Sequence, residues 1–243
     1  MKKLRLDQAL VKRKLVNSNK QAQSYIKLGL VKVSHKLVSN VLVWVSDDEV
    51  IEVKASEQFV SRAGLKLSSV ANDLGIDFSD KIVLDVGSST GGFTDYSVKH
   101  GAKKVVAVDV GSNQLHPSLR NNPLIELYEQ CDIRDFNKVD DFDLILIDVS
   151  FISLKEVMPT IYRLADDQTK ILAMFKPQFE ASAELKNKGI IKNNRIRRDL
   201  IKDFENWLKL NKFYVINSQD SSLSGLKGNL ERFFLIKKAG SNY

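Results

Sequence analysis

The stretch KIVLDVGSSTGGFTD, residues Lys81–Asp95, decides how this chain folds. It begins with a short apolar run, Ile82 to Val86, whose β-branched residues predict a buried parallel strand. A turn of small residues follows, and a helix is expected to begin near Gly92 or Phe93. A strand, a glycine-rich turn and a helix form the first half of a nucleotide-binding α/β unit, in which glycines let a ligand approach the backbone.

The turn departs from two common phosphate-binding motifs. A dinucleotide fingerprint would place glycine where this chain has Ser89, and no G-K-[ST] sequence follows as in a P-loop. Asp85, at the end of the strand, would repel phosphate and suits a ligand with cationic or hydroxyl groups. S-adenosylmethionine offers an amino acid, a sulfonium and a ribose, whereas a plain strand–turn–helix without a ligand is the alternative interpretation. The residues expected to bind this cofactor are Asp85, Gly87, Ser88, Ser89, Thr90, Gly91, Gly92 and Phe93.

The rest of the second half of the chain predicts more strands alternating with helices. Helices are expected at 61–75 and 197–210, and strands at 103–111, 124–130, 142–151, 170–180, 213–219 and 229–238. This pattern predicts an α/β fold with a doubly wound, Rossmann-like parallel sheet. The carboxyl ends of its strands would line the ligand crevice, and Asp109, Asp148 and Lys176 stand at such ends.

Two downstream acids are candidates for contacts with the nucleoside part of the cofactor. Asp109 follows Gly87 by 22 positions, close to the spacing at which an acid commonly binds ribose hydroxyls. Asp132 follows the third strand and could hydrogen-bond an adenine amino group or cap the next turn. The sequence leaves both roles of Asp132 open.

The residues after the fourth strand bear on the methyl acceptor. Many amine-methylating enzymes of this fold carry an N/D-P-P-Y/F sequence there, whereas this chain has DVSF at 148–151. Cys131 follows the third strand and is not evident as a nucleophile for carbon methylation. A hydroxyl acceptor must lose its proton as the methyl group arrives, and a lysine such as Lys176 can assist that step.

Charge is distributed unevenly along the chain. The net charge is +7, yet the first 46 residues hold ten Lys or Arg and one acid, so the remaining 197 carry −2. This asymmetry predicts a module that docks on a polyanion, joined to a module for chemistry. One cysteine and no apolar run of the roughly 20 residues that span a membrane favour the cytoplasm. The three histidines lack metal-ligand spacing, so no metal is expected.

The basic module resembles the alpha-L RNA-binding motif. The resemblance rests on RLDQAL at 5–10, S-x-K-x-A at 18–22 and I-x-x-G-x-V-x-V at 26–33, with departures at Asn19 and at Ser34-His35. It implies an RNA-binding domain at 1–54 with two short helices and small strands, and a linker at 55–60. The residues expected to contact RNA are Lys3, Arg5, Arg13, Lys14, Lys20, Lys27, Lys32 and Arg62.

Five further segments together resemble the TlyA family of hemolysin-A-like ribosomal RNA methyltransferases: SRAGLKL, DVGSSTGG, LILIDVSF, FKPQFE and GNLERFF. The resemblance implies an FtsJ-like, S-adenosylmethionine-dependent domain at 61–243 that methylates the ribose 2′-oxygen of cytidine in ribosomal RNA. It also implies a catalytic tetrad of Lys66, Asp148, Lys176 and Glu231. Lys176 would act on the hydroxyl as base or steering cation, and Asp148 would orient it. Lys66 would favour loss of a proton from Lys176, and Glu231 would bond the ribose or hold Lys66.

Other functions stay open at this point. The chain could be a non-catalytic RNA-binding or ribosome-assembly factor that uses the sheet as a scaffold. The hemolysin label suggests a membrane-lytic protein, for which the sequence offers neither a span nor a membrane-surface helix. A protein or a base nitrogen could be the methyl acceptor. The sequence leaves open the modified nucleotide, the choice between 16S and 23S RNA, and the oligomeric state.

Overall fold

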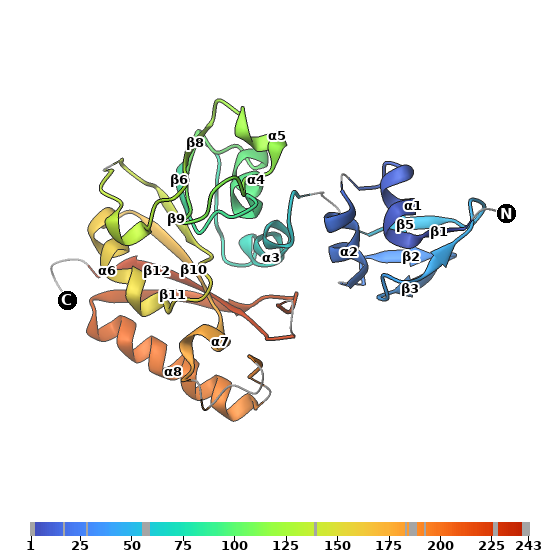
Figure 1. Ribbon diagram of the computed structural model, residues 1–243. Helices are drawn as coiled ribbons and strands as arrows, with labels where there is room; N and C mark the ends of the chain where they lie inside the picture. The colour runs from blue at the N-terminus through green and yellow to red at the C-terminus, as the bar shows by residue number, and fades with distance from the viewer. Residues whose placement is uncertain are drawn as a thin grey trace. The chain divides into compact units, whose positions relative to one another are not determined.

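The stretch around Gly87 forms strand β6 (Ile82–Val86), a turn and helix α4 (Gly92–Lys99) in the computed structural model, as the sequence predicts. Strand β6 is an inner strand of a seven-stranded sheet with the order β11-β12-β10-β9-β6-β7-β8 (Figure 1). The structure describes residues 3–16, 18–27, 29–54, 59–138, 140–182, 184, 189–191, 193–225 and 228–239.

The sheet is mostly parallel, which confirms the predicted α/β class. Its other strands are β7 (Lys104–Val108), β8 (Ile125–Tyr128), β9 (Leu144–Ile147), β10 (Lys170–Phe175), β11 (Phe213–Asp220) and β12 (Arg232–Lys238). Strands β6, β7, β8, β9 and β10 run parallel to one another, and β12 pairs antiparallel with both β10 and β11. After β8 the chain returns to the other side of β6, so a topological switch point lies between β6 and β9. Open α/β sheets bind ligands at the strand ends beside such a point.

Helices cover both faces of this sheet. Helices α6 (Leu154–Leu164) and α8 (Asn194–Leu210) bury apolar side chains against one face, in a core shared with Leu84 and Val86 of β6. Helix α4 contacts the opposite face, where Phe93 packs against Phe233 at 6.1 Å between ring centroids. The remaining helices of this unit are α3 (Arg62–Ala71), α5 (Pro117–Arg120), the 3₁₀ turn η1 (Ile133–Asp135) and α7 (Pro177–Glu180). Over the described residues, no helix combines the length and apolarity that crossing a membrane requires.

Residues 1–62 form a separate compact unit. Its elements are β1 (Leu4–Arg5), α1 (Leu6–Lys12), α2 (Asn19–Lys27), β2 (Val31–Val33), β3 (Lys36–Val38), β4 (Trp44–Val45) and β5 (Ile51–Val53). The predicted linker at 55–60 lies partly outside the described residues, which omit 55–58. Phe59 is buried and its carbonyl accepts a hydrogen bond from the Gln21 side chain, so this residue packs within the unit 1–62.

Candidate active site

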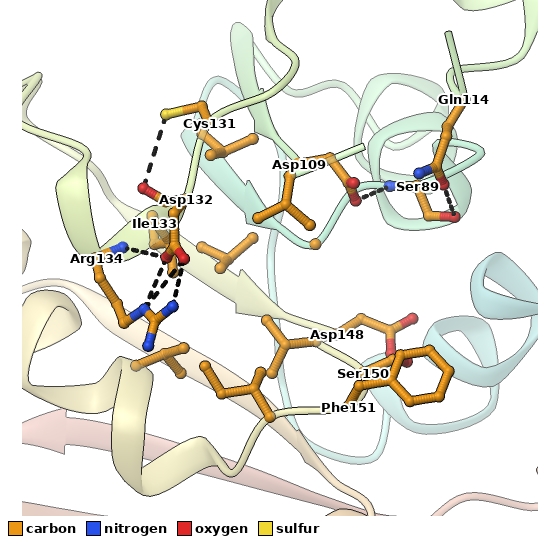
Figure 2. A pocket seen from close by; sticks show the side chains of 17 residues that line it. Ser89, Asp109, Gln114, Cys131, Asp132, Ile133, Arg134, Asp148, Ser150 and Phe151 are labelled. Atoms are coloured by element: carbon orange, nitrogen blue, oxygen red, sulfur yellow. Dashed lines mark hydrogen bonds and ion pairs between the residues drawn. The ribbon is translucent and has the colours of Figure 1, made fainter. Parts of the chain in front are cut away.

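A cavity of about 500 Å³ lies at the carboxyl ends of β6, β7 and β9, beside the switch point. Figure 2 shows its polar side chains, which come from the segments that follow β6, β7, β8 and β9. This volume lies within the range of roughly 300–1,000 Å³ that is typical of small-molecule sites. The cavity is lined by Val86, Gly87, Ser89, Val108, Asp109, Val110, Gln114, Cys131, Asp132, Ile133, Arg134, Asp148, Val149, Ser150, Phe151, Ile152 and Val157.

Asp109 ties two turns together at the rim of this cavity. Its carboxylate accepts a hydrogen bond from the backbone of Ser89 at 2.8 Å (Figure 2). It also accepts one from the backbone of Gly111 at 2.7 Å. Each carboxylate oxygen has a second lone pair, so Asp109 can still accept from a ligand hydroxyl. Gly87 has φ +81°, and a Cβ there would lie 3.0 Å from the Asp148 backbone oxygen. The turn therefore needs glycine to pack against the end of β9.

Asp132 caps the next turn and also lines the cavity. Its carboxylate accepts from the backbone of Arg134, at the start of η1, and forms an ion pair with the Arg134 guanidinium at 2.6 Å (Figure 2). The hydrogen bonds from Arg134 are the main cause that lowers the pKa of Asp132. Ile133 and Val157 contribute apolar wall next to this pair. The capping role left open by the sequence is thus present, and the carboxylate remains at the cavity.

Asp85, which the sequence predicts to contact the cofactor, is absent from the residues that line the cavity. Its neighbours Leu84 and Val86 join the core under α6 and α8. Because side chains alternate along a strand, Asp85 faces the other side, where Thr94 of α4 donates to it at 2.6 Å. Burial is the main cause that raises the pKa of Asp85 to about 7.

Three more of the predicted cofactor residues serve the packing of the turn. Phe93 is buried against Phe233, and a Cβ on Gly91 would lie 2.6 Å from the Leu115 side chain. The Thr90 carbonyl accepts from the backbone of His116 at 3.2 Å. The predicted cofactor residues that line the cavity are Gly87, Ser89, Asp109 and Asp132, whereas Asp85, Ser88, Thr90, Gly91, Gly92 and Phe93 are absent from its lining.

Lys176 and Asp148 form an ion pair at the cavity. Lys176 Nζ lies 2.6 Å from Asp148 Oδ1 and donates to Ser150 Oγ at 2.9 Å. The two charged side chains are 9% and 16% exposed, so the pair is shielded from water but reachable from the cavity. Ser150, which the sequence analysis did not select, sits in the DVSF segment directly after the fourth strand. Its position two residues after Asp148 is the sequence signal that could have identified Ser150 as a site residue.

Lys66 and Glu231 form a second buried ion pair. Their side chains are 11% and 4% exposed, and the lysine ammonium contacts a carboxylate oxygen of Glu231. Phe175 pairs with Arg232 in the antiparallel ladder of β10 and β12. Lys176 follows β10 and Glu231 precedes β12, each directly beyond this last pair, and Asp148 follows β9. These three residues therefore lie at the same end of the sheet, and the ion pair with Glu231 adds Lys66 from α3.

An exposed aromatic side chain stands beside this edge. Phe151 is 92% exposed and has φ +68°, a backbone conformation that is unusual for a bulky residue. Its ring centroid lies 5.2 Å from that of Phe179, and Lys176 Nζ lies 5.8 Å from the Phe179 centroid. Its exposure and its unusual backbone conformation make Phe151 a candidate functional residue, which the sequence did not indicate.

Two of the arginines predicted to contact RNA have partners within their own unit. The Arg13 guanidinium donates to three backbone carbonyls of the turn at 46–49, at 2.6 to 3.2 Å. Arg5 forms two hydrogen bonds with the buried Asp7 carboxylate, and they are the main cause that lowers the pKa of Asp7. Arg62 begins α3, and the Lys20 side chain lies outside the described part of the chain. The other predicted residues reach the surface: Lys3, Lys14 and Lys27 are exposed and Lys32 is partly exposed.

A model of the FtsJ-like methyltransferase family matches residues 59–239, and the chain belongs to this family. The seven-stranded sheet and the acid-lined cavity at its switch point fit this class of methyltransferase, which uses S-adenosylmethionine as methyl donor.

Three relatives support this assignment, and two of them cover nearly the whole chain. A Campylobacter jejuni protein named 23S rRNA (cytidine-2′-O)-methyltransferase TlyA is 42% identical over 75% of this chain and 72% of its own length. Hemolysin A of Brachyspira hyodysenteriae is 36% identical over 94% of this chain and 97% of its own length. A solved Streptococcus thermophilus structure that carries a hemolysin name is 32% identical, with a TM-score of 0.75, over 99% of this chain and 90% of its own.

The side chains of the cavity fit S-adenosylmethionine. Asp109, Asp132 and Asp148 bring carboxylates to a wall that is otherwise largely apolar. Carboxylates favour the cofactor's positive charges and ribose hydroxyls, and the aliphatic side chains suit an adenine ring. These carboxylates would repel the negative charges of a phosphate-rich ligand.

Proposed function

We propose that this chain methylates the ribose 2′-oxygen of a cytidine in ribosomal RNA. The Lys176–Asp148 ion pair at the cofactor cavity is the observation that carries this proposal. The name of the Campylobacter relative supports the substrate. Ribosomal subunits would be the partners, and the enzyme would act where they are found, in the cytoplasm.

Lys176 would act as a cation on the ribose hydroxyl. When bound, S-adenosylmethionine supplies an electrophilic methyl group on a positively charged sulfur. Lys176 forms an ion pair with the Asp148 carboxylate and donates a hydrogen bond to Ser150, and these two partners hold its charged group beside the cavity. The ammonium would orient the hydroxyl and stabilise the negative charge that develops on its oxygen. The hydroxyl loses its proton to solvent as its oxygen gains the methyl group.

Asp148 would couple the cofactor and acceptor sides of the site. Its carboxylate pairs with Lys176, and its backbone packs against Gly87 of the cofactor turn. This arrangement fixes the lysine relative to the cavity, and such positioning is worth several orders of magnitude in rate.

Lys66 and Glu231 would hold the acceptor nucleotide. The resemblance suggests that Glu231 either bonds the ribose or holds Lys66, and the buried ion pair favours the second role. We infer that Glu231 fixes the Lys66 ammonium at the sheet edge, where it can contact a nucleotide phosphate or sugar. Lysine and arginine contacts to the backbone are the usual means of positioning a nucleic acid.

Two surfaces support an RNA substrate. The exposed ring of Phe151 beside Phe179 offers a platform on which an unpaired base can stack. The basic N-terminal unit exposes Lys3, Lys14 and Lys27, whose charges suit phosphate contacts. We propose that this unit docks on the RNA and the methyltransferase unit performs the chemistry.

The test uses S-adenosylmethionine with a labelled methyl group and ribosomal subunits that lack the modification. The labelled RNA is digested and its nucleosides are separated. Label in 2′-O-methylcytidine is the expected result, and the labelled subunit distinguishes 16S from 23S RNA. Label in a base, in ribosomal protein or nowhere would contradict the proposal. Calorimetric titration with the cofactor serves as the control that the protein is folded and loaded.

A further inference from the structure

The turn at 176–180 contacts the segment 148–154 at three successive places. Both segments follow neighbouring parallel strands, β10 and β9, and meet side by side at the sheet edge. The contacts are the Lys176–Asp148 ion pair, the Phe179–Phe151 ring contact, and the hydrogen bonds from Ser153 and Leu154 to Glu180. Lys176 and Phe151 belong to the proposed acceptor site. Glu180 makes the last of the three contacts, at the start of helix α6.

Glu180 binds the first residues of helix α6 with both oxygens. One carboxylate oxygen accepts from the backbone of Leu154 at 2.8 Å, and the other accepts from the hydroxyl of Ser153. Ser153 is the N-cap of α6 and accepts from the backbone of Lys155 at 3.1 Å. The amides at the start of a helix lack partners within the helix, so an acceptor from another segment fixes how the helix begins.

A carboxylate suits this place better than a neutral side chain. The start of a helix carries partial positive charge, which stabilises an anion there. Burial raises the pKa of Glu180, while the hydrogen bonds from Leu154 and Ser153 oppose that shift. Glu180 is thus a partly buried acid whose two oxygens are both used to join α7 to α6.

We propose that Glu180 is a positioning residue for methyl transfer, because it anchors the 148–154 segment and thereby aligns Asp148 with Lys176. Glu180 lies four residues from Lys176, at the other end of the single turn α7. Its loss would free the start of α6 and let the segment carrying Asp148 and Phe151 shift relative to Lys176. Misplacement of about 1 Å at such a site can cost about 10²-fold in rate. This inference rests on the proposed function.

The test compares full-length variants E180A and E180Q with the matched control E184Q. Glu184 is an exposed acid close by in sequence, and its carboxylate accepts from the Ser182 hydroxyl at 3.1 Å. Three quantities are measured: hydrogen–deuterium exchange of the 148–155 peptide without substrate, the Kd for S-adenosylmethionine, and kcat and KM on ribosomal subunits.

E180A is expected to speed exchange in the 148–155 peptide and to lower kcat about 10- to 100-fold, with Kd and KM changed less than about threefold. E180Q retains an oxygen that can accept from Leu154, so it should recover most of kcat. E184Q should match the unchanged protein. If E180A does not fold, E180Q must still show faster exchange and a lower kcat than E184Q.

Unchanged exchange of the 148–155 peptide, or a parallel loss of cofactor binding and thermal stability, would overturn the positioning role. The exchange measurement needs no RNA. Failure of the unchanged protein to methylate RNA would therefore defeat the proposed function, while the exchange result would separately decide whether Glu180 anchors the segment.

Discussion

Lys176 and Asp148 are 28 positions apart in sequence, yet Lys176 Nζ lies 2.6 Å from Asp148 Oδ1. The two residues follow the adjacent parallel strands β10 and β9, and strand pairing brings them together. The position of Asp148 is further fixed by Gly87, which has no side chain to separate the turn from β9. The pair therefore joins the cofactor cavity to the edge where the acceptor is proposed to bind.

The substitution K176A is expected to lower methyl transfer about 10²- to 10³-fold, the usual cost of losing one group that stabilises charge developing on the reacting oxygen. The Kd for S-adenosylmethionine should change less than about threefold, because Lys176 does not line the cofactor cavity. Single-turnover rates and calorimetry measure the two effects. K170A, at the opposite end of β10, is the matched control. Retention of more than about a tenth of the rate would argue against the role of Lys176.

Substitutions of Glu231 and Lys66 should compensate for each other in stability but not in methyl transfer. Removing one partner of a buried ion pair leaves an uncompensated charge and costs about 3–5 kcal/mol, whereas replacing both can be nearly neutral. E231Q and K66M should each lower the free energy of unfolding, and the double variant K66M/E231Q should recover much of it. Methyl transfer should stay low in all three variants, because K66M removes the Lys66 ammonium and E231Q no longer holds it in place. Urea denaturation and labelling assays test this, and a double variant with restored activity would make the pair purely structural.

The β6 unit could be predicted because its signals are local. An apolar run, a positive-φ turn of glycines and a helix start occur within fifteen residues. Strand β3 is harder to predict, because its three residues, KLV, are too few to show a period. The positive φ angles of Ser34 and His35 make the hairpin turn that precedes it, without the usual Asn-Gly sequence.

The residues of the candidate site were harder to predict from the sequence than the β6 unit. Lys66 and Glu231 look like surface charges in their own segments, and the fold brings them together from positions 165 residues apart. The sequence predicts a cofactor contact for Asp85 because this residue stands near the end of a strand, beside the turn. The side chain of Asp85 lies on the face of the sheet that α4 covers, and the sequence of one strand does not reveal which face a helix will cover.

D85N should stabilise the protein, and more strongly at higher pH. The folded-state pKa of Asp85 is raised to about 7 from an ordinary 3.8, so between these values folding retains a proton that the unfolded chain has lost. Stability therefore falls as pH rises through this window, at up to about 1.4 kcal/mol per pH unit. D85N removes this loss and keeps an acceptor for Thr94. The gain in unfolding free energy should be small at pH 4 and of the order of 2–4 kcal/mol at pH 8. A gain independent of pH would contradict a buried, proton-binding Asp85.

Arg13 and Lys14 are neighbours with different expected roles. R13A removes hydrogen bonds to three carbonyls of the turn at 46–49 and should speed hydrogen exchange and proteolysis there. K14A should leave that turn unchanged and reduce RNA affinity. The slope of log affinity against log salt should then fall by about 0.7–0.9, the loss of one phosphate contact. Both variants are measured in the full chain, and an unchanged slope for K14A would remove Lys14 from the proposed RNA surface.

Phe151 should matter for the acceptor nucleotide more than for the fold. Its ring is 92% exposed, so F151A loses little packing, and loss of a base-stacking contact is worth about 1–3 kcal/mol. F151A is therefore expected to lower kcat/KM for ribosomal RNA about 5- to 100-fold with little change in Tm. F151W retains an aromatic face and should recover most of the loss. F151G relieves the strain of the +68° φ angle and should raise Tm while remaining as inactive as F151A. If F151G were as active as the unchanged protein, the backbone conformation of this turn, and not the ring, would be what the reaction requires.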